Sequence, residues 1–163
     1  GLWASSYVVQ GVGFHADPAA SFASLFFLGI TFGRFLCGFF AEKLGDKRLI
    51  RIGIFTAMVG AVLIGLPVPF DGLALAGLIT IGLGCAPIYP SIIHSTPFNF
   101  GKENSQSIIG IQMACAYVGT TLMPPLFGWL ASVAGIGLYP FYLLLFAVLM
   151  LVMSERLNRA VAK

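Results

Sequence analysis

The chain has 163 residues, of which 58% are apolar and only 9% are charged, and its net charge is +3. Soluble domains carry about 25% charged residues, because a surface in contact with water has to be solvated. The composition therefore excludes a cytosolic enzyme, a disordered tail, a collagen-like fibre and a secreted disulfide scaffold. Nine Lys and Arg residues are also too few for a nucleic-acid-binding surface. We expect an all-α membrane protein.

Apolar segments recur along the chain, and a helix needs about 20 apolar residues to span a bilayer. Runs such as FYLLLFAVLMLVM are apolar on every face, which favours helices over the alternating strands of a barrel. The chain starts without Met and lacks the basic start and cleavage site of a signal peptide. We therefore expect a fragment forming one six-helix domain over residues 1–163. Its predicted spans are 1–14 (partial), 19–41, 50–66, 72–94, 107–131 and 138–154.

The loops between the predicted spans alternate in charge. Eight of the nine basic residues fall on one side, and the loops on the other side contain none. The positive-inside rule makes the basic side cytoplasmic. The sequence thus predicts a multi-pass protein of the plasma or inner membrane with a cytoplasmic C-terminus.

Metal and catalytic chemistry find no support in the sequence. The three cysteines, Cys37, Cys85 and Cys115, fall within predicted spans, and their spacing matches no metal motif. No nucleophile–base pair or phosphate-binding loop appears either. We expect no metal, no cofactor and no enzyme activity.

One charged segment, residues 38–51 (GFFAEKLGDKRLIR), follows the second apolar stretch. Its glycine-x-x-x-acid-base-x-glycine pattern, followed by basic residues, resembles the signature of the major facilitator superfamily, which lies between the second and third helices of each six-helix half. Glu42 replaces the usual aspartate, and Asp46 stands where a basic residue is common. Such departures are typical of copies in the C-terminal half. The resemblance therefore implies helices 7 to 12, with an N-terminal six-helix half as partner.

In that family this cluster latches the two halves when the transporter faces outward. A glycine at position 38 allows a neighbouring helix to approach closely, and Glu42 could receive the positive end of a helix from the other half. Gly45 permits a tight turn. The alternative is a solvated positive loop. The expected latch and gate residues are Arg34, Gly38, Glu42, Lys43, Gly45, Asp46, Lys47 and Arg48.

Arg34 is the only charged residue in the interior of a predicted span, and buried ionisable groups in membranes are costly. It lies on the same helix face as Gly38 and Glu42, at steps of four. Its expected role is to support the latch or gate. Contact with a substrate or ion, and simple snorkelling to the interface, are the alternatives.

Three further stretches resemble the fucose permease-like branch of the superfamily: GLWASSYVV, GLGCAPIYPSIIHSTP and GIQMACAYVGTTLMPPLFGWLA. The resemblance implies transport of a sugar or similar small solute by rocking of two halves around a midplane site. Prolines within spans remove backbone donors and kink membrane helices. The expected kinks are at Pro87, Pro90, Pro124 and Pro125.

Aromatic and amide side chains are suited to sugars, because they combine stacking area with hydrogen-bond donors and acceptors. Packing between helices is the alternative role for such residues, and Gly29-x-x-x-Gly33 predicts close helix packing. The candidate substrate-binding residues are Trp3, Tyr7, Gln10, Tyr89, Gln112 and Tyr117.

No Asp or Glu lies within a predicted span. A proton-coupled carrier needs a titrating group in its central cavity, so a proton site would lie in the other half. The sequence leaves symport and uniport open. The alternatives are an exporter of drugs or apolar metabolites and, from another class, a non-transporting membrane sensor or interaction subunit.

Overall fold

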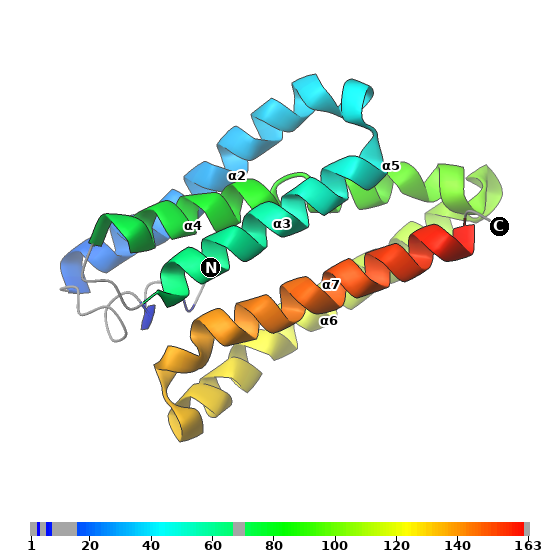
Figure 1. Cartoon of the computed structure of the whole chain (residues 1–163). Helices are drawn as coiled ribbons and strands as arrows, with labels where there is room; N and C mark the ends of the chain where they lie inside the picture. The colour runs from blue at the N-terminus through cyan, green and yellow to red at the C-terminus, as the bar shows by residue number, and fades with distance from the viewer. Residues whose placement is uncertain (1–2, 4–5, 8–15, 67–70, 162–163) are drawn as a thin grey trace.

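The structure is a computed structural model that describes residues 3, 6–7, 16–66 and 71–161, with the backbone alone for 16–23, 42 and 71. Helices follow one another along the described chain, and no strand occurs in it (Figure 1). They are α2 (Ala16–Leu44), α3 (Asp46–Gly65), α4 (Asp71–Cys85), α5 (Ile88–Phe100), α6 (Lys102–Ala134), the 3-10 helix η1 (Ile136–Leu138) and α7 (Tyr139–Val161). The predicted all-α fold class is confirmed.

Five helical stretches in the described chain are long and apolar enough to cross a membrane. They overlap the five complete spans expected from the sequence. Most of the predicted partial helix at residues 1–14 lies outside the described residues, although Trp3, Ser6 and Tyr7 are helical. The stretches are Ser24–Ala41, Asp46–Gly65, Gly72–Phe100, Lys102–Ala134 and Ile136–Val161.

The span that contains α4 and α5 is interrupted in its middle, at Ala86 and Pro87. The N–H of Ala86 still bonds the carbonyl of Gly82 at 3.1 Å. Pro87 and Pro90 have no N–H, so the carbonyls one turn before them lose their helical donors. The chain therefore stops one helix at Cys85 and begins another at Ile88.

Single glycines make the turns at the charged end of the bundle. Gly45 joins α2 to α3 with a φ of 74°, and Gly101 joins α5 to α6 with a φ of 83°. Left-handed φ values are unfavourable for residues with a Cβ, which explains glycine at both positions. The tight turn expected at Gly45 is thus present. The segments around it, expected as a loop, are helical, so the charges of the motif lie on helix ends.

α4 lies between α2 and α3 and contacts both along its length (Figure 1). Glycines make this approach possible. A Cβ at Gly29 would lie 2.5 Å from the carbonyl oxygen of Ile79, and one at Gly84 would lie 2.6 Å from that of Gly53. Close packing at Gly29-x-x-x-Gly33 is confirmed, because a Cβ at Gly33 would also lie 3.2 Å from the carbonyl oxygen of Leu83 on α4.

Two apolar clusters attach the remaining helices. The first joins α3, α4, α6 and α7 around Tyr7, Phe127 and Tyr139, and the second joins α3 and α5 to α7 around Ile54. Large apolar side chains elsewhere on α2, α6 and α7 are exposed; Phe39, for example, is 65% exposed. Such surfaces suit contact with lipid or with other membrane helices.

Candidate functional site

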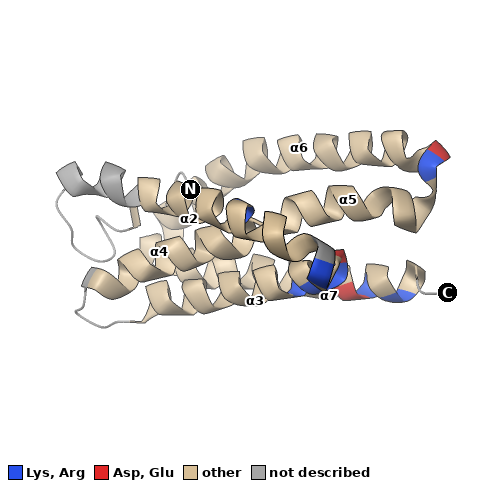
Figure 2. Cartoon of the chain, turned by 90° about the horizontal axis from the view of Figure 1, so that it is seen from above, with Lys and Arg blue, Asp and Glu red and all other residues tan. Residues whose placement is uncertain are grey.

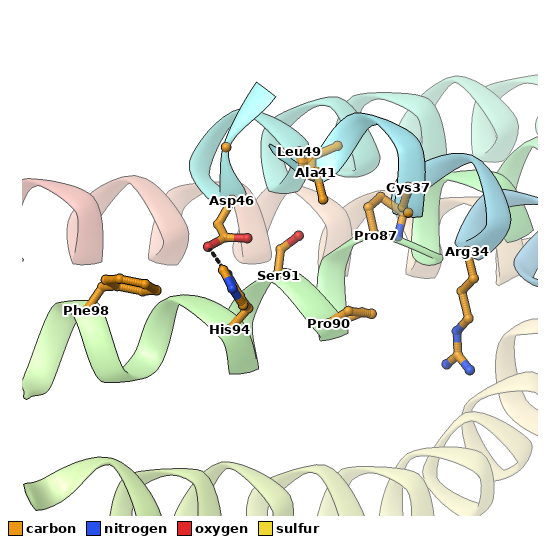
Figure 3. Close-up of a pocket in the computed structure, with 12 residues that line it drawn as sticks. Arg34, Cys37, Ala41, Asp46, Leu49, Pro87, Pro90, Ser91, His94 and Phe98 are labelled. Carbon is orange, nitrogen blue, oxygen red and sulfur yellow. Dashed lines mark hydrogen bonds and ion pairs between the residues drawn. The ribbon is translucent and has the colours of Figure 1, made fainter. Parts of the chain in front are cut away.

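A pocket of about 650 Å³ lies between α2, the beginning of α3 and α5 (Figure 3). It brings together residues that the sequence placed in two separate groups, the latch and the helix kinks. The interruption after α4 starts α5 at Ile88 and places its first two turns along the pocket. The lining residues are Arg34, Cys37, Gly38, Ala41, Gly45, Asp46, Leu49, Pro87, Pro90, Ser91, His94 and Phe98.

At one end of the pocket, His94 on α5 meets Asp46, the first residue of α3. His94 Nδ1 lies 2.8 Å from Asp46 Oδ2 (Figure 3). The Asp46 side chain is 19% exposed and that of His94 is 70% exposed. A carboxylate in the first turn of a helix is favoured by the helix dipole. This pair joins two helices whose sequence positions are 48 residues apart.

Arg34 lies toward the other end of the pocket. Figure 3 shows its side chain extending from α2 past Pro90, away from Asp46 and His94. Among the described side chains, no carboxylate lies within ion-pair distance of its guanidinium. The pocket therefore has a cation that no described carboxylate pairs with at one end and a hydrogen-bonded acid–imidazole pair at the other.

The remaining latch residues lie on an exposed surface of α2 and the start of α3. A Cβ at Gly38 or at Gly45 would meet no described atom within 4 Å. Lys43, Lys47 and Arg48 are exposed. The side chain of Glu42 lies outside the described residues. The pocket wall on α2 is thus uncovered by the described part of the chain.

Two of the substrate candidates lie between helices, and their polar atoms are bonded to the backbone. Trp3 Nε1 donates to the carbonyl oxygen of Pro124 at 3.0 Å. The Tyr7 hydroxyl donates to the carbonyl oxygen of Ile64 at 3.1 Å, and Tyr7 is only 8% exposed. Gln10 lies outside the described residues.

The other three candidates lie along α5 and α6. Gln112 Nε2 donates to Thr96 Oγ1 at 3.2 Å, and that hydroxyl lies 2.9 Å from the carbonyl oxygen of Ile92, to which it donates. The Tyr89 hydroxyl contacts Met113 Sδ at 3.2 Å. Tyr117 is 71% exposed. None of the five described candidates lines the pocket.

The prolines expected to kink two spans differ in their surroundings. Pro87 and Pro90 lie at the interruption between α4 and α5. Pro124 and Pro125 lie inside α6, which remains helical on both sides of them. Gly128, one turn later, leaves room for the Trp3 ring, which would lie 2.8 Å from a Cβ at that position.

One ion pair at the charged end of the bundle was not predicted from the sequence. Arg51 on α3 donates through Nε and Nη2 to the two carboxylate oxygens of Glu155 on α7, with 2.7 Å between Nη2 and Oε2. Figure 2 shows the charged residues gathered at this end of the bundle. Nothing in the sequence pairs positions that are 104 residues apart.

The described side chains contain no group of three or more His, Cys, Asp or Glu residues that could hold a metal ion. The comparison with protein families shows that residues 2–157 are similar to the family described as Major Facilitator Superfamily. No curated protein matches the chain, and no solved structure does. The family match includes every residue that lines the pocket.

Proposed function

The chain belongs to the Major Facilitator Superfamily, a family of membrane transporters, and from this premise we propose that it moves a small polar solute, a sugar, across the membrane by alternating access. The superfamily consists of transporters rather than enzymes, and five apolar helices make the chain a multi-pass membrane protein. The solute class is the proposed part.

The observation that carries the proposal is the pocket beside the interrupted span. Transporters build solute sites where helices are discontinuous, because freed backbone groups and nearby side chains can bind a ligand there. Here the interruption at Ala86 and Pro87 adjoins a cavity that contains Arg34, Ser91 and His94. These side chains supply hydrogen-bond donors and acceptors that suit a polar solute.

The latch residues have a proposed role in switching between states. Gly38 and Gly45 have open space where a Cβ would lie, and Asp46 is oriented by His94. We assign the uncovered wall of α2 to contact with the other half of the transporter in one of its two states. The exposed Lys43, Lys47 and Arg48 suit anionic lipid headgroups at the membrane surface.

The fragment, its orientation and its coupling are proposals as well. We assign the chain to helices 7 to 12 of a longer protein in the plasma or inner membrane. The end that carries the charges and the C-terminus (Figure 2) is proposed to be cytoplasmic. A coupled proton, if one is used, is proposed to bind in the N-terminal half.

The test is solute uptake by the full-length protein in proteoliposomes. A panel of neutral sugars, acidic sugars and apolar drugs is offered with and without an inward-acid pH gradient. Saturable uptake of any sugar supports the proposal, and stimulation by the gradient identifies symport. Movement of the apolar drugs alone would instead identify an exporter, and failure to move any solute would contradict the proposal.

A further inference from the structure

We propose that the pocket at the inner end of α2 and α5 binds the acidic group of a hydroxylated solute, a sugar acid, with Arg34 as the residue that holds its charge. This inference rests on the proposed function and narrows its solute class. The same chemistry, an acid on a hydroxylated body, is found in the headgroups of anionic phospholipids. The proposal is the solute, and the experiment below separates the two sources.

Arg34 has no carboxylate partner among the described side chains. It lies ten residues before the end of α2 at Leu44, which is about 15 Å along the helix axis. A cation at that depth is costly unless it faces water, a cavity or a partner of opposite charge. Arg34 lines the pocket, and no described carboxylate pairs with it. The carboxylate of a ligand in the pocket could form a bidentate ion pair with the Arg34 guanidinium.

Asp46, His94 and Ser91 line the pocket away from Arg34 and have polar atoms that can bind a ligand. Asp46 uses Oδ2 to bond His94 Nδ1, which leaves Oδ1 and the second ring nitrogen for a ligand. Ser91 is only 5% exposed, and its hydroxyl makes no hydrogen bond to the described chain although it faces the pocket (Figure 3). An acceptor, a ring nitrogen and a hydroxyl together form a set that binds the hydroxyls of a sugar.

Apolar side chains also line the pocket. Pro90 on α5 and Leu49 on α3 line the pocket between His94 and Arg34, and Phe98 lines it beyond His94 (Figure 3). Such apolar surface can cover the C–H face of a sugar ring. A volume of about 650 Å³ lies within the usual range of small-molecule sites. The pocket thus contains a cation, hydroxyl-binding groups and apolar surface, which are the three features that a sugar acid needs.

The test measures binding apart from transport. The full-length protein in detergent is titrated with D-glucuronate, D-gluconate or D-glucose, and its melting temperature is recorded. We expect an acid to raise the melting temperature saturably while D-glucose does not. Arg34→Gln should weaken binding of that acid by roughly tenfold or more, the loss of about one charge-assisted pair. Arg34→Lys should retain part of the affinity for the acid, because lysine keeps the positive charge but lacks the planar guanidinium that forms two parallel hydrogen bonds.

Arg156→Gln is the matched control, because Arg156 is an exposed cation on α7 that lies outside the pocket. It should bind the acid as the wild type does. If Arg34→Gln does not fold, Arg34→Lys and Ser91→Ala still report on the pocket, each with an expected loss of affinity.

Three results would overturn the inference: equal binding of glucose and the acids, an affinity for the acid that Arg34 substitutions leave unchanged, or no binding of either acid. A fourth result would also overturn the inference: phosphatidylglycerol in nanodiscs raises the melting temperature through Arg34, and neither acid displaces the bound lipid. That result would assign the pocket to a lipid headgroup. Uptake of neutral sugars in proteoliposomes would then leave the proposed function standing. Conversely, binding of an acid without uptake of any solute would support the pocket and contradict transport.

Discussion

The indole Nε1–H of Trp3 donates to the carbonyl oxygen of Pro124 at 3.0 Å and so joins two residues 121 positions apart. The Trp3 ring meets Phe127 edge-on, with 5.6 Å between ring centroids, and lies over the bare backbone of Gly128. Indole has a single donor and no acceptor. Trp3 therefore uses its only polar atom to hold the start of the described chain against α6.

Trp3→Phe should remove this hydrogen bond while it keeps an aromatic ring in place. We expect the free energy of unfolding to fall by about 1 kcal/mol, the usual net value of one such bond. Trp129→Phe is the control, since Trp129 is 69% exposed, and it should change stability less. Denaturant unfolding in detergent measures both. A Trp3→Phe variant with wild-type stability and a raised KM for solute would instead assign Trp3 to substrate binding.

Gln112 and Thr96 provide a second test of a candidate site residue. Thr96 is only 1% exposed, whereas Gln112 is partly exposed. Because the two side chains bond each other, Gln112→Ala and Thr96→Val should each cost about 1 kcal/mol, and the double variant should cost less than the sum. If Gln112 also binds solute, only Gln112→Ala should raise KM. Equal KM values in both variants would reduce Gln112 to a helix-packing role.

Gly84 lies where α4 comes closest to α3. A Cβ there would meet backbone atoms of Gly53 and Ala57, which cannot rotate away. Gly84→Ala should therefore destabilise the protein by about 1–3 kcal/mol. Gly137→Ala is the matched control, because a Cβ at Gly137 meets no described atom within 4 Å. Thermal unfolding of the two variants decides, and equal melting temperatures would contradict the close approach.

A substitution at Gly38 tests whether this position matters for the change between transport states and not for folding. A Cβ at Gly38 meets no described atom within 4 Å, so Gly38→Leu should leave the yield of folded protein near that of the wild type. If another helix docks there in one transport state, the leucine should slow uptake. A bias of about 1.4 kcal/mol against that state would change its population relative to the other state tenfold.

Gly33→Leu provides the contrast to Gly38→Leu, because a Cβ at Gly33 already lies 2.5 Å from Ala86 Cβ. It should lower the folded yield itself, as measured by size-exclusion chromatography. Wild-type uptake by Gly38→Leu would remove the latch assignment.

Local features of the fold could be predicted because their physical causes are local. Long apolar runs require spanning helices, and the positive φ of Gly45 follows from the turn that the motif demands. The span expected over residues 72–94 extends to Phe100 and is interrupted at Ala86 and Pro87, near the two prolines where kinks were expected. Proline spacing indicated the place of the break but not its extent.

Local sequence patterns are enough to predict a membrane protein and the family it resembles. Burial in lipid acts on every residue of an apolar run, so each long run predicts a spanning helix. Which side chains share a cavity depends on how the helices pack, and local patterns do not show that. Asp46 and His94, and likewise Arg51 and Glu155, meet because helix packing brings distant positions together. The same packing separated the aromatic candidates from the pocket and placed Arg34 in it.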